Sequence, residues 1–201
     1  MTYTGGEGPP PGRPRLVSDE QVFAALAEAI TEHGPHRWTL PDVADRVGLT
    51  GPALGYRFGN KRGLLLAFAA HQPGATAAYF DEVAAEAPTP AAAIVDALAG
   101  DLSLMDTRAK VANNIAMLSI DLADEELAHY ASAQAKIIKA KLAELITAGG
   151  IATDGEAMPL AERIYIVWSG AVLAWAIDGQ GTLDTWLRRH IHNTIAKADQ
   201  A

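Results

Sequence analysis

Residues 39–58 read TLPDVADRVGLTGPALGYRF. Thr39 and Thr50 are helix-capping residue types, and each is followed two positions later by a proline, which predicts the starts of two short helices. Gly48 lies between them, where a glycine in the left-handed conformation ends the first helix. Two short helices joined by a tight glycine-containing turn form a helix-turn-helix, whose second helix enters the major groove of DNA. The spacing therefore predicts DNA binding, although short helix pairs with a glycine turn also occur in other folds.

The rest of the chain predicts further helices and no sheet, because no clear alternation of apolar and polar residues is enriched in β-branched side chains. Ser18 and Gln21 fit a capping box at the start of a helix that should end near Gly34. Asn60 should cap another helix, which the segment 71–74 (HQPG) either kinks or breaks. The remaining helices are expected at 89–100, 103–121, 124–148, 158–178 and 183–198. We therefore predict an all-α protein.

Charge is distributed unevenly along the 201 residues, whose net charge is −8. Residues 1–70 hold 7 basic and 7 acidic side chains, whereas residues 71–201 hold 9 and 17. Within residues 35–62 the count is 5 basic against 2 acidic, a local charge of +3. DNA affinity depends on the charge of the contacting face, so this excess suits phosphate binding, while it is also compatible with ordinary surface charge.

The composition predicts a cytoplasmic protein. The chain has no cysteine, which excludes disulfides and cysteine-ligated metal sites and suits a reducing compartment. The Pro- and Gly-rich residues 1–14 lack the apolar core of a signal peptide, and residues 1–17 as a whole predict a disordered arm. Charged residues or glycines interrupt the apolar stretches short of about 18–20 residues, so no membrane span is expected.

Three motifs near the N-terminus are similar to those of a known family. The turn 47–50 (VGLT) resembles the Gly-Val-Ser step of the TetR repressor family, Leu54, Tyr56 and Phe58 match its Leu-Tyr-Tyr-His-Phe stretch, and residues 60–65 (NKRGLL) resemble the start of its fourth helix. Residues 16–68 thereby resemble the DNA-binding domain of that family. The resemblance implies an N-terminal three-helix helix-turn-helix domain at 18–70 and a C-terminal helical ligand-binding and dimerisation domain at 71–201.

Two positions depart from the family's pattern. Gly55 stands where the family usually has tyrosine, and Arg57 stands where it usually has histidine. Gly51 and Gly55 each cost so short a helix about 1 kcal/mol relative to alanine. Gly55 either allows closer approach to the groove or reflects drift with weakened affinity, and Arg57 either contacts DNA or pairs with Asp45.

The candidate DNA-binding residues comprise base and backbone contacts. Thr50 caps the second helix and can reach a phosphate or a base, while Pro52 and Ala53 offer apolar contact to a thymine methyl. Arginines in the N-terminal arm suit insertion into a narrow minor groove, although the arm can equally be an inert tail. The full set is Arg13, Arg15, Arg37, Thr39, Thr50, Gly51, Pro52, Ala53, Tyr56, Arg57 and Lys61.

Apolar residues at helical spacing mark the last two predicted helices. The family resemblance implies that these helices pair with those of a second copy, and the alternative is that the stripe packs within the subunit. The predicted dimer interface consists of Ile164, Val167, Ala171, Val172, Leu183, Trp186, Leu187 and Ile191.

Methionine and aromatic side chains are the candidates for a ligand pocket, although residues of these types at helical spacing are also typical of an ordinary core. The candidate ligand-binding residues are Met105, Met117, Tyr130, Trp168 and Trp175. Pocket statistics favour a hydrophobic ligand.

No enzyme motif, such as Gly-x-Ser-x-Gly, a P-loop or His-Glu-x-x-His, is found. His190 and His192 face different directions on a helix, so they do not form a metal-binding pair. Neither a metal site nor a cofactor is expected. We expect a transcriptional repressor, not an enzyme, that binds double-stranded operator DNA as a homodimer without a membrane partner. An unknown small-molecule effector should release it from the operator. The alternative is an all-helical small-molecule-binding or interaction protein with a degenerate helix-turn-helix.

Overall fold

The computed structural model describes residues 17–100, 102 and 104–198, and every regular element in that part of the chain is a helix. The predicted all-α class is therefore confirmed. The predicted arm lies, apart from Val17, outside the described residues. The helices are α1 (Asp19–His33), α2 (Leu40–Arg46), α3 (Gly51–Phe58), α4 (Lys61–Glu86), α5 (Pro90–Gly100), α6 (Arg108–Ala123), α7 (Glu125–Ala148), α8 (Asp154–Asp178) and α9 (Leu183–Ala198).

Short-range hydrogen bonds set the starts of the N-terminal helices as predicted. The Gln21 N–H donates to Ser18 Oγ over 3.2 Å, and the Ser18 N–H donates to Gln21 Oε1 over 2.9 Å. Thr39, Thr50 and Asn60 cap α2, α3 and α4 by accepting from the backbone three residues ahead. Because each bond closes within one turn, these helix starts follow from local sequence.

Two predicted helix boundaries in the C-terminal half are wrong. The helix expected at 103–121 begins at Arg108, because Thr107 Oγ1 accepts from the Lys110 N–H over 3.3 Å. The helix expected at 158–178 begins at Asp154, because Thr153 and Glu156 form a capping box one turn earlier. In each case a threonine cap decides the start.

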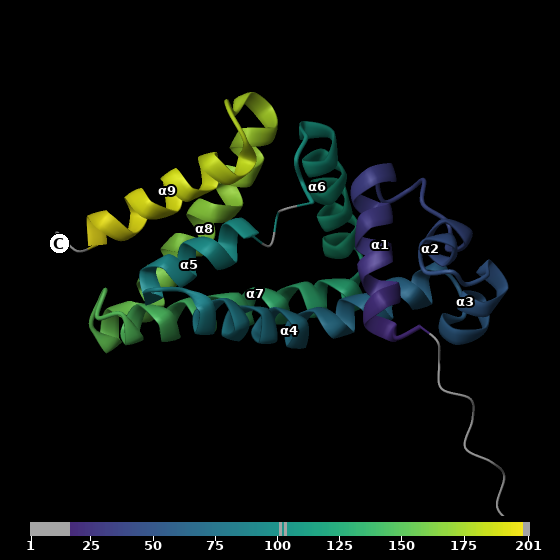
Figure 1. The fold of residues 1–201 in the computed structure, drawn as a ribbon, viewed down its shortest axis with the longest axis horizontal. Coiled ribbons are helices and arrows are strands. Elements are labelled where there is room, and N and C mark those ends of the chain that lie inside the picture. Colours follow the sequence, from purple (N-terminus) through teal and green to yellow (C-terminus); the bar gives the residue numbers. More distant parts are fainter. Residues whose placement is uncertain (1–16, 101, 103, 199–201) are drawn as a thin grey trace, which may run out of the picture.

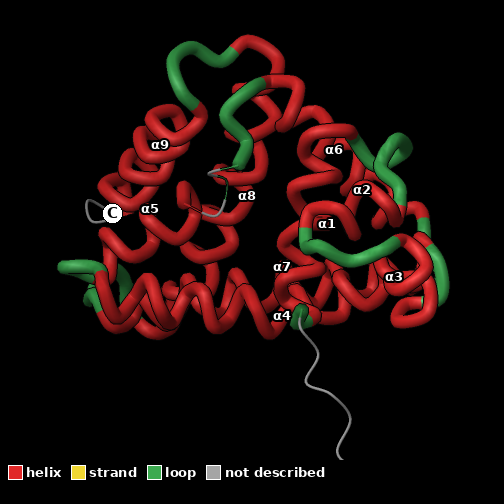
Figure 2. The backbone as a smooth tube through the Cα atoms, turned by 45° about the vertical axis from the view of Figure 1, so that its right-hand side comes forward, coloured by secondary structure: helices red, strands yellow, loops and turns green. Residues whose placement is uncertain are grey.

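Helix α4 is continuous through the segment 71–74, with Pro73 inside it, so the alternative of a break there is wrong. Figures 1 and 2 show α4 and α7 side by side along the base of the molecule, and this packing supports α4 on both sides of the proline. The proposed domain boundary at residue 70 therefore falls within α4, which connects the N-terminal helices to the C-terminal helices.

The buried residues form two clusters at opposite ends of α4. Side chains of α1, α2 and α3 pack on the start of α4 around Leu26, Leu54 and Leu64, none of which is exposed. Side chains of α5, α7, α8 and α9 form the larger cluster around Ile94 and Leu142. Helix α6 stands beside α1 and spans the space between the two ends (Figure 1).

By length and composition alone, α8 is apolar enough to cross a membrane, which differs from the expectation drawn from its interruptions. A core helix of a soluble protein has the same composition, so this property is weak evidence for a membrane span. Ile164 and Trp175 are buried against other helices of the same chain. We therefore treat α8 as a packing helix.

Candidate nucleic-acid interface and adjoining cavity

Helices α2 and α3 form the predicted helix-turn-helix. Gly48 follows α2 with φ +67°, and the Leu49 N–H donates to the Ala44 carbonyl over 2.9 Å, which closes the turn. Val43, Ala44 and Leu54 are fully buried between the helices and α1, so the outer side of α3 is free to face a partner. Local capping and a small buried residue at the crossing thus set the angle of α3.

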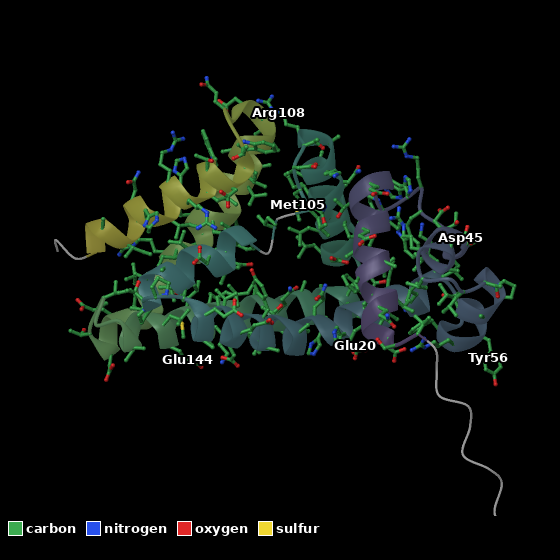
Figure 3. All side chains as sticks on the ribbon, in the orientation of Figure 1. Glu20, Asp45, Tyr56, Met105, Arg108 and Glu144 are labelled. Carbon is green, nitrogen blue, oxygen red and sulfur yellow. The ribbon has the colours of Figure 1, made fainter. Side chains whose placement is uncertain are left out.

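The outer side of α3 presents apolar and aromatic groups to solvent. Pro52 and Ala53 are exposed, and the Tyr56 side chain projects away from the protein with 96% of its surface exposed (Figure 3). The hydroxyls of the exposed Thr39 and Thr50 are engaged as caps at the helix starts. A tyrosine without packing partners is the most prominent side chain that α3 offers to a ligand.

The two glycines of α3 have different surroundings. A Cβ built at Gly51 would lie 3.2 Å from the Cγ of Pro41, so glycine lets α2 and α3 approach closely there. A Cβ built at Gly55 would meet nothing within 4 Å. Packing therefore accounts for Gly51 and leaves Gly55 unexplained.

Most of the local positive charge counted in the sequence is engaged within the protein. The Arg46 guanidinium pairs with Glu28 over 3.3 Å and with Glu32, and these contacts tie α2 to α1. Arg57 donates to the Val17 carbonyl over 3.0 Å and pairs with Asp19, so the suggested partner Asp45 is wrong.

The cations at the start of α4 are also engaged. Lys61 Nζ donates to the Trp38 carbonyl over 2.8 Å and lies 4.2 Å from the Trp38 ring centroid, and burial lowers the pKa of its ammonium. Arg62 binds Asp124 over 2.9 Å and Glu126 over 3.1 Å. Arg37 is exposed and donates from Nε to the His33 carbonyl, which leaves its other nitrogens available. Arg13 and Arg15 lie outside the described residues.

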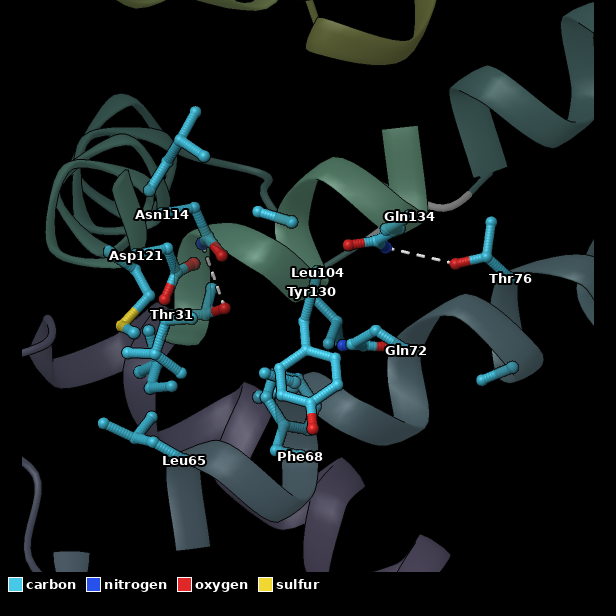
Figure 4. Close-up of a pocket in the computed structure, with 18 of the residues that line it drawn as sticks. Thr31, Leu65, Phe68, Gln72, Thr76, Leu104, Asn114, Asp121, Tyr130 and Gln134 are labelled. Atoms are coloured by element: carbon cyan, nitrogen blue, oxygen red, sulfur yellow. Dashed lines mark hydrogen bonds between the residues drawn. The ribbon is translucent and has the colours of Figure 1, made fainter. Parts of the chain in front are cut away.

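A cavity of about 460 Å³ lies between α1, α4, α6 and α7 (Figure 4). Met105, Met117 and Tyr130 line it, whereas Trp168 and Trp175 do not. Trp168 Nε1 donates to the Leu98 carbonyl over 2.9 Å, and Trp175 is buried in the C-terminal cluster. The polar lining residues that sequence reasoning missed include Thr31, Gln72, Thr76, Asn114, Asp121 and Gln134. No apolar periodicity marks such residues, so only their convergence in space reveals them.

The wall of this cavity is bonded to α1 of the helix-turn-helix domain. Asn114 Nδ2 donates to Thr31 Oγ1 over 3.1 Å, and Asn113 Nδ2 donates to the Thr31 carbonyl over 2.9 Å. Thr31 is only 4% exposed, and both Thr31 and Asn114 line the cavity. A molecule in the cavity would therefore touch the joint between α1 and α6.

The residues predicted at a dimer interface mostly pack within their own chain. Ile164, Ala171, Leu183, Leu187 and Ile191 are buried in the C-terminal cluster, and Val167, Val172 and Trp186 are partly buried.

A different stripe of α8 is open to solvent. Ile166, Leu173 and Ile177 are 68%, 49% and 69% exposed, and Ser169 and Gly170 lie between them on the same side. Large exposed apolar side chains in one row mark an interaction surface. The exposed side chains of α8 are thus adjacent in the sequence to the residues predicted for the dimer interface.

Within the described ranges, no group of three or more His, Asp or Glu side chains is arranged to hold a metal ion.

Residues 22–68 match the family model described as bacterial regulatory proteins, tetR family. The fold of the whole chain is similar to a transcriptional regulator from Rhodococcus sp. Rha1, with 20% identity, a TM-score of 0.67 and coverage of 92% of this chain and 97% of that one. It is also similar to a TetR transcriptional regulator from Legionella pneumophila (18% identity, TM-score 0.70, coverage 92% and 99%). FadR from Bacillus subtilis in complex with stearoyl-CoA is a further match (16% identity, TM-score 0.59, coverage 89% and 98%). No curated protein matches the chain. The predicted TetR resemblance of the N-terminal residues and the all-helical fold are confirmed.

Proposed function

We propose that this protein is a transcriptional repressor released from operator DNA by a small molecule. The proposal starts from residues 22–68, which match the helix-turn-helix domain of TetR-family regulators. The observation that carries the proposal is the outward-facing α3, with Tyr56 fully exposed, on a domain whose α1 is bonded to the wall of a cavity. We assign it a cytoplasmic location and no catalytic role.

The exposed side of α3 suits the major groove. Pro52 and Ala53 can contact thymine methyl groups, and Tyr56 can reach a phosphate or a base edge. Arg37 and the arginines of the arm are the proposed phosphate contacts, with Thr39 and Thr50 at the helix starts. Lys61 joins them because its ammonium is bound to a neutral carbonyl and an aromatic ring, which leave its charge uncompensated. Gly51 is assigned to the close approach of α2 and α3.

A second copy of the chain is the proposed partner of α8. One short recognition helix reads few bases, whereas a two-fold dimer addresses two half-sites. The row of Ile166, Leu173 and Ile177 supports this pairing, and Ser169 and Gly170 permit close approach of the helices. The buried residues first predicted for the interface then pack α8 and α9 together within one subunit.

The proposed release is a population shift between two arrangements of the dimer. A ligand in the cavity changes the packing of α6 against α1, and the Asn114–Thr31 hydrogen bond transmits that change to the helix-turn-helix domain. The relative FadR was determined with stearoyl-CoA. Its occupied state supports a small-molecule effector for this fold.

The engagement of Arg46, Arg57 and Arg62 by carboxylates favours the alternative of a ligand-binding protein with a degenerate helix-turn-helix. Fluorescence anisotropy with labelled DNA from upstream of the protein's own gene separates the two. A repressor binds this DNA more tightly than scrambled DNA of equal length, with an affinity that falls steeply with salt.

Two matched variants sharpen this test. Arg37→Ala removes an exposed charge beside the helix-turn-helix, and Lys136→Ala removes one from the exposed side of α7. We expect the first to weaken binding and the second to leave it unchanged. Weak binding that stays independent of sequence even at low salt would refute the repressor function.

A further inference from the structure

The cavity beside α1 has one charged side chain. Of the described residues that line it, none is lysine, arginine or histidine, and Asp121 is the single carboxylate. Leu65, Phe68 and Met117 supply apolar wall around it. A ligand therefore meets one negative charge in an otherwise uncharged, largely apolar site.

Asp121 has no partner within the described part of the protein. No hydrogen bond or ion pair joins its carboxylate to another side chain, although the residue is partly buried. Burial, with a smaller contribution from the neighbouring Asp124, raises the pKa of the Asp121 carboxyl to about 6. Because Asp124 is itself held by Arg62, that guanidinium is already committed. A partly buried, unpaired carboxylate is a costly feature that a bound cation would relieve.

The neighbouring amides expose acceptors to the same space. Asn114 donates its amide hydrogens to Thr31 Oγ1 and to the Lys110 carbonyl, which leaves Oδ1 free. Gln134 Nε2 donates to Thr76 Oγ1 over 3.1 Å, which leaves its Oε1 free. Figure 4 shows these groups converging on the cavity from α4, α6 and α7. Free acceptors match a ligand that donates hydrogen bonds.

We propose that this cavity binds a cationic amphiphile, whose ammonium or amidinium group lies against Asp121 and whose apolar body lies along Phe68 and Met117. This inference rests on the proposed function, since it names the chemical class of the effector. A charge-assisted hydrogen bond to the carboxylate orients the cation. An acidic amphiphile would instead bring a second negative charge to a site without a cation, so the cavity discriminates between head groups of equal size.

The test uses three probes with the same ten-carbon chain: decylammonium, decanol and decanoate. Isothermal titration calorimetry of the full chain at pH 7.5 gives the affinities, with decylammonium and decanoate below their micelle concentrations and decanol below its solubility limit. We expect decylammonium to bind at least tenfold more tightly than decanol, and decanoate to bind most weakly. In Asp121→Asn the preference for decylammonium over decanol should fall below threefold, with decanol affinity retained.

Glu82→Gln is the matched control, because it removes an acid from the exposed side of α4 outside the cavity lining. Its probe preference should equal that of the wild type, and circular dichroism establishes that both variants are folded. Equal binding of decanoate and decylammonium, an unchanged preference in Asp121→Asn, or no binding of decylammonium would each overturn the proposal.

DNA binding of the same preparations without probe separates this inference from the proposed function. A preference that depends on Asp121 in a protein that fails to bind DNA specifically supports the cavity assignment and refutes the repressor. Specific DNA binding without the ammonium preference refutes the cavity assignment alone.

Discussion

Replacement of Asp121 by asparagine should make the protein more stable at neutral pH. The native state raises the pKa of this carboxyl from 3.8 to about 6, so its proton is held more tightly in the folded chain than in the unfolded chain. The stabilisation by that proton is present at low pH and is lost as the pH rises from about 4 to about 6. Above that range the folded protein carries a destabilising charge, which Asp121→Asn removes.

The magnitude follows from the same change in pKa. A rise from 3.8 to about 6 corresponds to roughly 3 kcal/mol if it is fully expressed. Asp121 is only partly buried and faces a cavity, so water screens part of the cost. We expect the free energy of unfolding of Asp121→Asn to exceed that of the wild type by about 1 kcal/mol at pH 7.5, and the difference to approach zero at pH 4.

Urea denaturation followed by circular dichroism measures this difference at pH 4, 6 and 7.5, at one fixed protein concentration because the stability of the proposed dimer would depend on it. Glu82→Gln, the exposed control, should change the free energy of unfolding by less than about 0.5 kcal/mol at each pH. An asparagine variant that is no more stable than the wild type at pH 7.5, or whose gain is the same at all three values, would refute the argument. Such a result would mean that the Asp121 carboxylate is well solvated in the native state.

Three further substitutions test other parts of the structure. Gly55→Ala should stabilise the protein by about 0.5–1 kcal/mol in thermal or urea unfolding, because the added methyl meets nothing within 4 Å, and a loss of stability would contradict an open site. Lys61→Ala should weaken binding to all DNA sequences and lower the slope of log affinity against log salt by about 1, and an unchanged slope would remove Lys61 from the phosphate contacts. Ile166→Glu should shift sedimentation equilibrium toward the monomer, whereas Leu122→Glu, at a similarly exposed position on α6, should not; equal behaviour of the two would argue against α8 as the interface.

Features that depend on residues three or four apart could be predicted from the sequence. The capping box at Ser18 and Gln21, the threonine caps and the glycine turn at residue 48 lie where the local pattern placed them. The continuity of α4 could not be predicted from the sequence. Proline normally disrupts a helix interior, whereas packing of α4 against α7 on both sides of Pro73 keeps the helix intact. The start predicted at residue 158 is wrong for a different reason, because the capping box of Thr153 and Glu156, itself a local signal, begins the helix one turn before Pro159.

Which residues belong to the candidate sites depended on the tertiary structure more than the helix boundaries did. The count of basic residues in 35–62 overstated the charge available to DNA, because Arg57 and Arg62 find carboxylates far away in the sequence. Periodicity correctly marked α8 as apolar. Both of its sides carry apolar residues, however, and packing of α8 against α7 and α9 decided that Ile164 is buried while Ile166 is exposed.

Caps, turns and helical periodicity are encoded within one or two turns of backbone, so an all-helical chain with an N-terminal helix-turn-helix followed from local sequence. Three-dimensional packing was needed to establish which cations remain available, which side of α8 faces outward, and that Asp121 is unpaired in a cavity next to α1. These properties depend on side chains brought together from helices distant in the sequence. A carboxylate's partner, or its lack of one, is settled by the packing of those helices.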